Sequence, residues 1–427
     1  MKVLLVGASG LIGSAVAAAL AREGHVILGV ARQSRPGGPV AQWLKLDVAS
    51  ARRPEDWSCH LKDIDAVINC AGVLQDNARE NTHGVHSSGA GALFEACERG
   101  GVRRIIHLSA IGVDRAQPSS FSATKYLGDQ QLITKDLDWV ILRPSVVLGR
   151  PAYGASALIR GLASLPLLPL MPGTQPLQIV QLSDLVATIL FFLGRESPSH
   201  LALEIVGPER LTMGEIIAKY RVWYGWDLPR SFVIPSTVAK CLYAIGDMAG
   251  LLGWRPPVRS NAAREIARGA IGDPEPWISI TGIRPLSLDE ALAREPATVQ
   301  EKWFARLYLL KAIIFPVLAA FWLVTGVISL TLGYAAGVDL MRSTGAGVLS
   351  GPAVIAGALA DSIIGLCIAW RPLTRPGLYA ALGLSVFYAI AGTLLHPDLW
   401  IEPLGPLLKI IPILMLHLVA LAILEER

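Results

Sequence analysis

The sequence predicts an α/β protein with a doubly wound parallel sheet and a small α+β substrate subdomain, followed by an all-α, four-helix transmembrane domain. Two observations lead to this fold class. The N-terminal residues read as a strand, a glycine-rich turn, a helix and a second strand, which is the repeating unit of a doubly wound sheet. Charges are also unevenly distributed, since the first 306 residues hold 60 charged side chains and Leu307 to Leu424 hold nine.

Composition narrows the possible function classes. Of the 427 residues, 52% are hydrophobic and 17% are charged, whereas soluble domains carry about 25% charged residues. The net charge of +4 is small and spread out, so nothing favours a nucleic-acid-binding protein. The five cysteines are odd in number and form neither a CxxC motif nor a Cys/His cluster. We therefore expect neither a disulfide framework nor a metal site.

The first chemical motif is the turn Gly7-Ala-Ser-Gly10-Leu-Ile-Gly13, which follows the apolar strand Lys2–Val6 and precedes an Ala-rich helix over 14–23. Glycines allow a tight turn and a close approach to a pyrophosphate, and a helix N-terminus attracts its negative charge. The order of elements predicts a Rossmann-type nucleotide-binding domain over residues 1–150. The alternative is a structural turn without a ligand. The expected nucleotide contacts in this turn are Gly7, Ser9, Gly10, Leu11 and Ile12.

The end of the second strand, expected over 25–30, bears on cofactor choice. An NAD site usually carries an acid about 20 residues after the glycines. Here Arg32 follows the strand, and the next acid is Asp47. A guanidinium forms charge-assisted hydrogen bonds with a phosphate, so we expect NADP(H) to be preferred over NAD(H). The alternative is that Arg32 is a solvated surface residue.

Together these motifs resemble the short-chain dehydrogenase/reductase superfamily in its extended and atypical branches. The similarity covers roughly residues 1–290 and includes segments typical of the branch related to an accessory subunit of respiratory complex I. The matching segments are Gly7-x-x-Gly10-x-x-Gly13, Leu46-Asp47-Val48, Asn69-Cys70-Ala71-Gly72, Ile105 to Ser109, Trp139 to Gly149, Gln178 to Asp184 and Ile205 to Thr212. The resemblance implies an active-site role for Ser109 and cofactor contacts from Asp47, Val48, Cys70, Ala71, Gly72 and Pro144.

The catalytic motif departs from this family. Its members use Tyr-x-x-x-Lys on one helix, in which the tyrosine exchanges the substrate proton and the lysine holds the nicotinamide ribose. The best match here is Phe121-Ser-Ala-Thr-Lys125, and a phenylalanine has no proton to exchange. Tyr126 lies about 100° around the helix from Lys125. We expect Lys125 to keep its ribose role, while Ser109 is either a catalytic hydroxyl or a strand-end residue without chemistry.

Residues 151–300 are expected to form the substrate-side α+β subdomain. The proline-rich segment 165–172 is predicted as a loop beside the substrate cleft. The apolar segment 233–252 is predicted as a helix in the core under the cleft, with a helix on the membrane surface as the alternative.

Residues 305–424 are predicted to cross the membrane. The run Ala312 to Tyr334 has no charge over 23 residues, enough for about 30 Å of hydrocarbon. Three further spans are expected over 348–370, 376–395 and 404–424, and the pattern resembles the DoxX-like family. The alternative is a buried helical core. Lys and Arg lie before the first span and between the second and third, which places the N-terminal domain and the C-terminus in the cytoplasm.

Three ionisable residues lie within the predicted spans: Asp361, Lys409 and His417. Such groups are costly in lipid and mark either a functional site or a polar pair between helices. Asp361 together with His417 or Lys409 is a candidate for binding a quinone head group or relaying a proton, and the alternative is a polar clamp between helices. Two functions remain open: an oxidoreductase that passes hydride to a quinone or another lipophilic acceptor, or an inactive NADPH-binding accessory or sensor subunit of a membrane complex.

Overall fold

The computed structural model describes residues 1–34, 37–77, 80–403 and 405–424. These residues form two compact units. The first comprises Met1–Met248 and Pro256–Ala305, and the second comprises Ala249–Arg255 and the residues from Arg306 onward. A short central segment of the chain thus belongs to the second unit.

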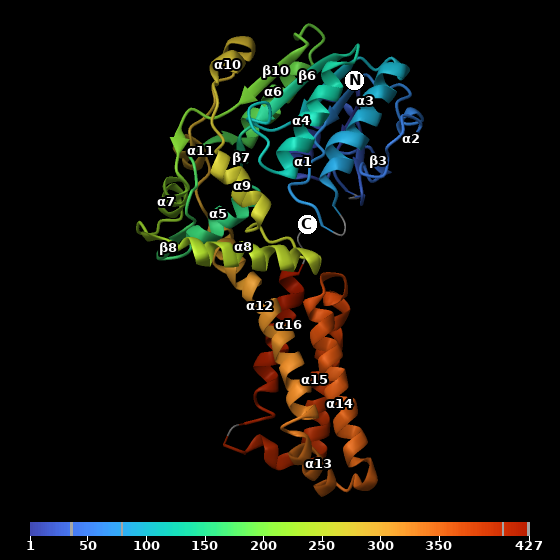
Figure 1. The fold of residues 1–427 in the computed structure, drawn as a ribbon, viewed down its shortest axis with the longest axis vertical. Coiled ribbons are helices and arrows are strands. Elements are labelled where there is room, and N and C mark those ends of the chain that lie inside the picture. The colour runs from blue at the N-terminus through green and yellow to red at the C-terminus, as the bar shows by residue number, and fades with distance from the viewer. Residues whose placement is uncertain (35–36, 78–79, 404, 425–427) are drawn as a thin grey trace. The chain divides into compact units, whose positions relative to one another are not determined.

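The first unit is built on a seven-stranded sheet whose neighbouring strands are all parallel. The strand order is β10-β6-β5-β4-β1-β2-β3, so the order reverses between β1 and β4, where doubly wound folds bind their ligands. This sheet confirms the predicted fold class of the N-terminal domain (Figure 1). The strands span β1 Lys2–Val6, β2 Val26–Ala31, β3 Gln42–Lys45, β4 Ala66–Asn69, β5 Arg104–Leu108, β6 Asp138–Pro144 and β10 Leu201–Ile205.

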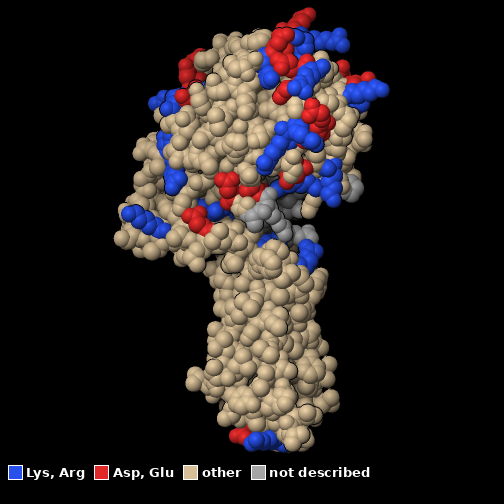
Figure 2. All heavy atoms as spheres, turned by 45° about the vertical axis from the view of Figure 1, so that its right-hand side comes forward, with Lys and Arg blue, Asp and Glu red and all other residues tan. Residues whose placement is uncertain are grey.

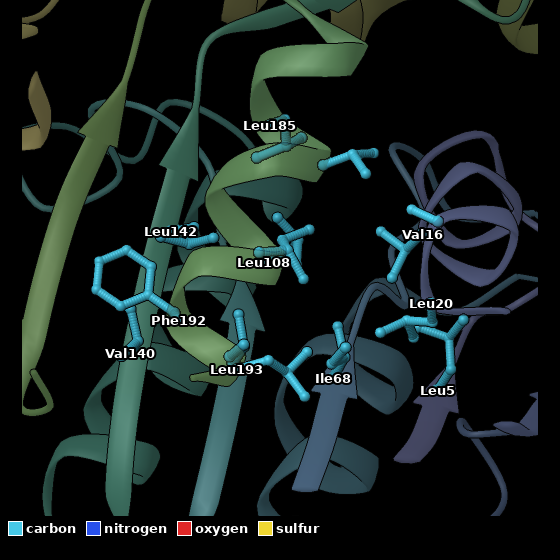
Figure 3. Close-up of a cluster of buried hydrophobic side chains, with 14 of the residues drawn as sticks. Leu5, Val16, Leu20, Ile68, Leu108, Val140, Leu142, Leu185, Phe192 and Leu193 are labelled. Atoms are coloured by element: carbon cyan, nitrogen blue, oxygen red, sulfur yellow. The ribbon is translucent and has the colours of Figure 1, made fainter. Parts of the chain in front are cut away.

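Each face of the sheet is covered by helices around its own apolar core, because a parallel sheet buried on both sides needs two such layers. On one face, Val16 and Leu20 of α1 and Phe192 of α6 pack against the strands, as Figure 3 shows. On the other face, Phe94 of α3 and Leu132 of α4 form the second core. The helices are α1 Leu11–Arg22, α6 Leu182–Leu193, α2 Glu55–Ser58, α3 Gly89–Gly100 with the preceding π-turn Gly84–Ser88, and α4 Ser120–Ile133.

A third core holds the α+β part that follows β6. Its three-stranded sheet, in the order β11-β9-β7, carries the buried Ile179, against which Ile217 and Tyr220 of α7 are clustered. The elements are β7 Val146–Leu148, α5 Ala155–Ala163, β9 Leu177–Gln181, β11 Arg210–Leu211, α7 Met213–Trp223, α9 Ser260–Arg268, α10 Glu275–Thr281 and α11 Leu288–Arg294.

Two segments of this part differ from the sequence expectation. The proline-rich stretch expected as a loop contains the strand β8 Leu167–Leu170, which pairs in parallel with β12 Arg230–Val233. The prolines fit there because these two strands form a two-stranded sheet, in which edge positions need no further ladder bond. The apolar helix expected in the core is α8 Ser236–Leu251, and most of its large apolar side chains are exposed.

The second unit is helical, and Figure 2 shows that Lys, Arg, Asp and Glu are absent from most of its visible surface. Within the described residues, three helices are long and apolar enough to cross a membrane: Val299–Leu330, Gly347–Ala369 and Arg371–Leu395. The last apolar helix, Ile410–Ile423, has 14 residues, fewer than the roughly 20 that a span needs. The expected fourth span began at Leu404, which lies outside the described residues.

The helices of the second unit are α12 Val299–Leu330, α13 Tyr334–Ser343, α14 Ser350–Ala369, α15 Thr374–Leu395 and α16 Ile410–Ile423, with short 3-10 turns at Gly347–Leu349, Arg371–Leu373 and Pro397–Trp400. The apolar core of the bundle includes Trp322, Ile368 and Ala420. The helix α13, which connects the first two long helices, was not expected from the sequence.

Candidate nucleotide site

The glycine turn follows β1 at the point where the strand order reverses. Gly7 has a φ of 77°, and a Cβ there would lie 2.9 Å from the Ala71 nitrogen. A Cβ on Gly13 would lie 2.2 Å from the Gly7 oxygen. Only glycine fits these two positions, because such distances are far below a van der Waals contact. Gly7 thus lets the turn lie close to the backbone of Cys70 and Ala71, and Gly13 lets the helix lie close to Gly7, without an intervening side chain.

The first turn of α1 is suited to an anion. Its N-cap is Gly10, which contributes no capping side chain, and no acid stands in the first turn. Backbone N–H groups at a helix N-terminus, together with the helix dipole, favour a phosphate. The predicted contacts Ser9, Leu11 and Ile12 all lie in this turn or at the start of the helix.

The loop after β4 lies directly against the glycine turn. The Cys70 nitrogen donates to the Val6 oxygen at 2.9 Å, and the Asn69 side chain accepts from the Ala71 nitrogen at 3.1 Å. Burial raises the pKa of the Cys70 thiol to about 12, so Cys70 is an uncharged wall of the site rather than a nucleophile. The structure thus brings Cys70, Ala71 and Gly72 together with the glycines.

The carboxyl end of β2 is followed by Arg32, the residue predicted to select NADP(H) over NAD(H). The Arg32 guanidinium lies just after β2 and pairs with Glu80, with 3.1 Å between Nη2 and Oε1. Asp47 and Val48 follow β3, where the Asp47 carboxylate accepts from the Ala49 nitrogen at 3.1 Å. Arg32 is therefore held beside the edge that receives the adenosine half of a dinucleotide in this type of fold.

Lys125 projects from α4 into the carboxyl edge of the sheet. Its Nζ donates to the Leu108 oxygen at 2.6 Å and to the Ala71 oxygen at 3.3 Å, so it joins the ends of β4 and β5. Burial lowers the pKa of Lys125 to about 8, although the nearby Asp129 carboxylate opposes this shift. Ser109 follows Leu108 directly and is buried. The two predicted catalytic residues thus lie at one strand end.

Phe121 stands one helical turn before Lys125 on the same face of α4. Its ring packs edge-on against His86, with centroids 5.6 Å apart. The His86 Nε2 accepts from the Val73 nitrogen at 3.0 Å, and its Nδ1 lies 2.9 Å from the Thr124 hydroxyl. Burial and the Lys125 charge keep the pKa of His86 well below its usual range. His86 is therefore a neutral, fully bonded wall and does not replace the missing tyrosine as an acid.

A buried polar network beneath the site was not found from the sequence. Asn69 Nδ2 lies 3.2 Å from His107 Nδ1, and His107 Nε2 lies 3.6 Å from Asp129 Oδ1. The Arg143 guanidinium donates to Asp129 Oδ2 at 3.1 Å and to Asp114 at 2.6 Å. Burial raises the pKa of Asp129. The Ser109 hydroxyl and the Arg143 charge lower this pKa, but they offset the effect of burial only in part. The network links the end of β4 to the end of β6, next to Pro144, and positions the loops that line the site.

The three ionisable residues of the apolar helices have different surroundings in the structure. The Tyr388 hydroxyl of α15 donates to Asp361 Oδ1 of α14 at 3.0 Å. His417 accepts from Trp322 Nε1 at 2.9 Å, and its Nδ1 lies 2.7 Å from the Ile413 oxygen. Lys409 is exposed at the N-cap of α16. Asp361 and His417 thus have separate hydrogen-bond partners within the described helices, and their joint role at a quinone or in a proton relay stays a prediction.

The arrangement fits a dinucleotide cofactor. Two glycines whose Cβ positions are sterically forbidden lie next to an uncapped helix start, and a buried ammonium lies at the adjacent strand ends. These are the groups that a pyrophosphate and a ribose would need.

Comparison with known families agrees with this site. Residues 7–162 match a family described as NAD(P)H-binding, and residues 319–418 match the DoxX-like family. These matches agree with the predicted nucleotide-binding domain and with the predicted DoxX-like domain.

Similar proteins include a ceramide reductase and proteins of an epimerase family. A ceramide reductase of Caulobacter vibrioides is 25% identical over 192 residues, which cover 44% of this chain and 60% of that protein. An epimerase family protein of Mycobacterium leprae is 26% identical over 302 residues, covering 64% of this chain and 93% of that protein. The match to the reductase thus spans less than two thirds of its length.

Among solved structures, the UDP-glucuronic acid 4-epimerase of Bacillus cereus, in complex with UDP-glucuronic acid and NAD, is 19% identical with a TM-score of 0.52. The match covers 72% of this chain and 100% of that one. The Bordetella bronchiseptica enzyme WbmG, in complex with NAD, is 15% identical with a TM-score of 0.55, and the match covers 72% of this chain and 96% of that one. At these identities the similarity concerns the fold.

Proposed function

We propose that this chain, which joins an NAD(P)-binding domain to a DoxX-like helical domain, is a membrane-anchored oxidoreductase that reduces a lipophilic acceptor. The observation that carries the proposal is the placement of Lys125. Its ammonium lies between the Ala71 and Leu108 carbonyl oxygens at the strand ends, beside the glycine turn. Bound NAD(P)H would supply a hydride there. A domain with only a structural role has no need of a buried lysine at this point, because burying a charge is costly.

The side chains around Lys125 favour an acceptor that needs no protein acid. Phe121 has no exchangeable proton, and His86 is neutral and bonded at both nitrogens. Reduction of a quinone takes one hydride and one proton to give a hydroquinone, and water can supply that proton to an exposed oxygen. A quinone thus suits the site better than a simple ketone, whose reduction relies on the tyrosine that is absent here.

Two observations support a lipophilic acceptor. The chain carries three helices, within its described residues, that are apolar enough to cross a membrane. One of the relatives is a ceramide reductase, a name that denotes a lipid substrate. We extend this lipid character to the present chain as part of the proposal.

We also propose that the cofactor is NADP(H). Arg32 follows β2 in a position where the family's NAD-binding members carry an acid. The Arg32 guanidinium pairs with Glu80, and a 2′-phosphate would compete with that carboxylate for charge-assisted hydrogen bonds.

For the membrane part we propose four spans, with the first unit and the C-terminus in the cytoplasm. In this arrangement α16 and the turn before it form the fourth span, and Lys409 reaches toward the outer surface. The basic residue Arg371 lies in the short connection between α14 and α15, and Arg375 lies in the first turn of α15. The positive-inside rule assigns this end of the two helices to the cytoplasm.

The main alternative is an inactive NADPH-binding accessory or sensor subunit of a membrane complex. Phe121 is the observation that favours it, since the loss of the tyrosine removes the usual chemistry while the nucleotide cradle remains.

The decisive experiment follows oxidation of NADPH by the purified full chain in detergent, with and without a short-chain quinone. Quinone-dependent oxidation is the expected result. A Lys125→Met variant is the matched control, since it removes the ammonium but keeps the stem that packs at the strand ends. Tight NADPH binding without oxidation, across quinones and ketones, would favour the accessory subunit instead.

The same assay tests cofactor choice when NADPH and NADH are compared in the native chain and in Arg32→Ala. Loss of a charged hydrogen-bond partner costs about 1.5–3 kcal/mol, or roughly ten- to a hundredfold in affinity. We expect this loss for NADPH and little change for NADH. An equal loss for both cofactors would mean that Arg32 does not recognise the 2′-phosphate.

A further inference from the structure

The helix α8 presents an apolar face that the chain leaves uncovered. The spacing of its apolar residues places them on one face of the helix. These residues are Val238, Cys241, Leu242, Ile245 and Met248. All five are exposed, with Ile245 at 62% and Met248 at 66%. Large apolar side chains that form a continuous exposed face mark an interaction surface rather than ordinary surface scatter.

The opposite face of α8 is firmly packed, so the exposure does not come from a loose helix. A Cβ on Gly246 would lie 1.9 Å from the Val258 oxygen. Asp247 accepts from Arg259 Nε at 3.1 Å and from the Ser260 hydroxyl at 2.5 Å. These contacts fix the rotation of the helix about its axis and hence the direction of its apolar face.

The C-terminal end of α8 runs directly into the bundle of long apolar helices. Ala249–Arg255 belongs to the second unit. The Arg371 nitrogen donates to the Leu252 oxygen at 3.0 Å, and Trp254 Nε1 donates to the Ala369 oxygen at 2.8 Å. Arg371 also lies over the Trp254 ring, 5.5 Å from its centroid. The end of α8 is therefore attached where α14 ends and the connection to α15 begins.

We propose that α8 is an interfacial helix whose apolar face lies in the headgroup region of the cytoplasmic bilayer surface. Chain continuity brings the helix to the end of a membrane-crossing element, and tryptophan and arginine at that level are typical of a membrane interface. Residues 228–260 carry four basic side chains and one acid, namely Arg230, Lys240, Arg255, Arg259 and Asp247. This net positive charge matches the anionic lipids of a cytoplasmic leaflet. The inference rests on the spanning bundle and does not depend on the oxidoreductase activity.

Two native cysteines provide a matched test in the full chain. Cys241 lies on the apolar face of α8, and Cys59 is an exposed thiol at the end of α2. Cys59→Ser leaves Cys241 for labelling, and Cys241→Ser leaves Cys59. Each variant is labelled in detergent with a small fluorescent maleimide and reconstituted in vesicles of mixed anionic and zwitterionic lipid. The double variant gives the background from the remaining thiols.

The readouts are quenching by a spin label carried on the lipid headgroup region and quenching by iodide in water. At an interface we expect the Cys241 probe to be quenched by the lipid label at least about twofold more than the Cys59 probe, with the reverse order for iodide. Equal iodide quenching at both positions would place the α8 face in water and overturn the proposal. Protection of the Cys241 probe from both quenchers would also overturn it, because a protein surface and not lipid would then cover the helix.

Discussion

Lys125 is a buried ammonium whose charge depends on pH near neutrality. Its pKa is lowered from 10.5 to about 8 because burial removes water, an effect that Asp129 only partly offsets. A phosphate- and ribose-bearing ligand favours the protonated form. Binding is therefore linked to the proton, and the affinity is lost as the pH rises through the pKa of the free protein.

We expect the affinity for NADPH to fall between pH 7 and pH 9.5, by up to about tenfold per pH unit above pH 8. Fluorescence titration of the full chain at several pH values measures this slope, and Lys125→Met should flatten it. In the unfolded chain Lys125 keeps its usual pKa of 10.5, whereas in the ligand-free fold its pKa is about 8. Between these values the unfolded chain binds more protons, so this group raises the free energy of unfolding as the pH rises. The expected loss of affinity is thus not caused by unfolding through this residue. An unchanged slope in Lys125→Met would remove the lysine from the binding site.

Site residues whose role depends on a local sequence pattern could be predicted from the sequence. Site residues brought together by contacts between distant parts of the chain could not. Gly7, Gly10 and Gly13 follow a strand and open a helix, so local geometry alone identifies them. Asn69, His107 and Asp129 come from β4, β5 and α4, and only the strand order places them together. A hint was present, since Asp129 stands four residues after Lys125 and therefore on the same helical face.

At the scale of elements, Tyr388 of α15 makes polar contacts with α14 inside an apolar bundle. Tyr388 donates to Asp361, and ionisable groups at such positions mark either chemistry or a clamp between helices. An asparagine at position 361 keeps an acceptor for the tyrosine but carries no exchangeable carboxyl proton. This substitution therefore separates the two roles.

If Asp361 takes part in reducing the acceptor, Asp361→Asn should lower quinone-dependent turnover by about tenfold or more. NADPH affinity and the melting temperature should stay close to the native values. Tyr388→Phe is the control, because it removes the hydrogen bond and keeps the carboxyl. Native turnover in Asp361→Asn would leave the residue with a packing role alone.

The helix α8 was expected in the core, but most of its large apolar side chains are exposed. Apolar periodicity predicted the helix correctly but not whether its apolar face is buried. The spacing of its apolar residues is the same for a core helix and for one at a membrane surface. The position of Ala249–Arg255 within the second unit is a long-range property. The membrane helices were easier to predict because length and lack of charge identify them directly. The exception is Ile410–Ile423, whose preceding residues form turns rather than a longer helix.

For the whole molecule, the proposed orientation is open to a direct check. The exposed Cys59 should react with a membrane-impermeant maleimide only after the cytoplasmic membrane of the expressing cells is opened. The variant Arg342→Cys, near the C-terminal end of α13, should react in intact cells, because the segment between the first two long helices lies outside in the proposed topology. Labelling of Cys59 in intact cells would invert the arrangement.

The hydrogen bonds of Leu252 and Trp254 have a practical consequence for dividing the protein. A chain cut near residue 300 would still contain α8 and the 249–255 segment. That segment would lose the Ala369 oxygen, which accepts from Trp254, and Arg371, which contacts Leu252 and Trp254. The excised N-terminal unit would expose the apolar side chains of α8 together with a 249–255 segment that has lost its hydrogen-bond partners. We expect it to associate with detergent or membranes, so a soluble form would require polar substitutions in α8 and in this segment.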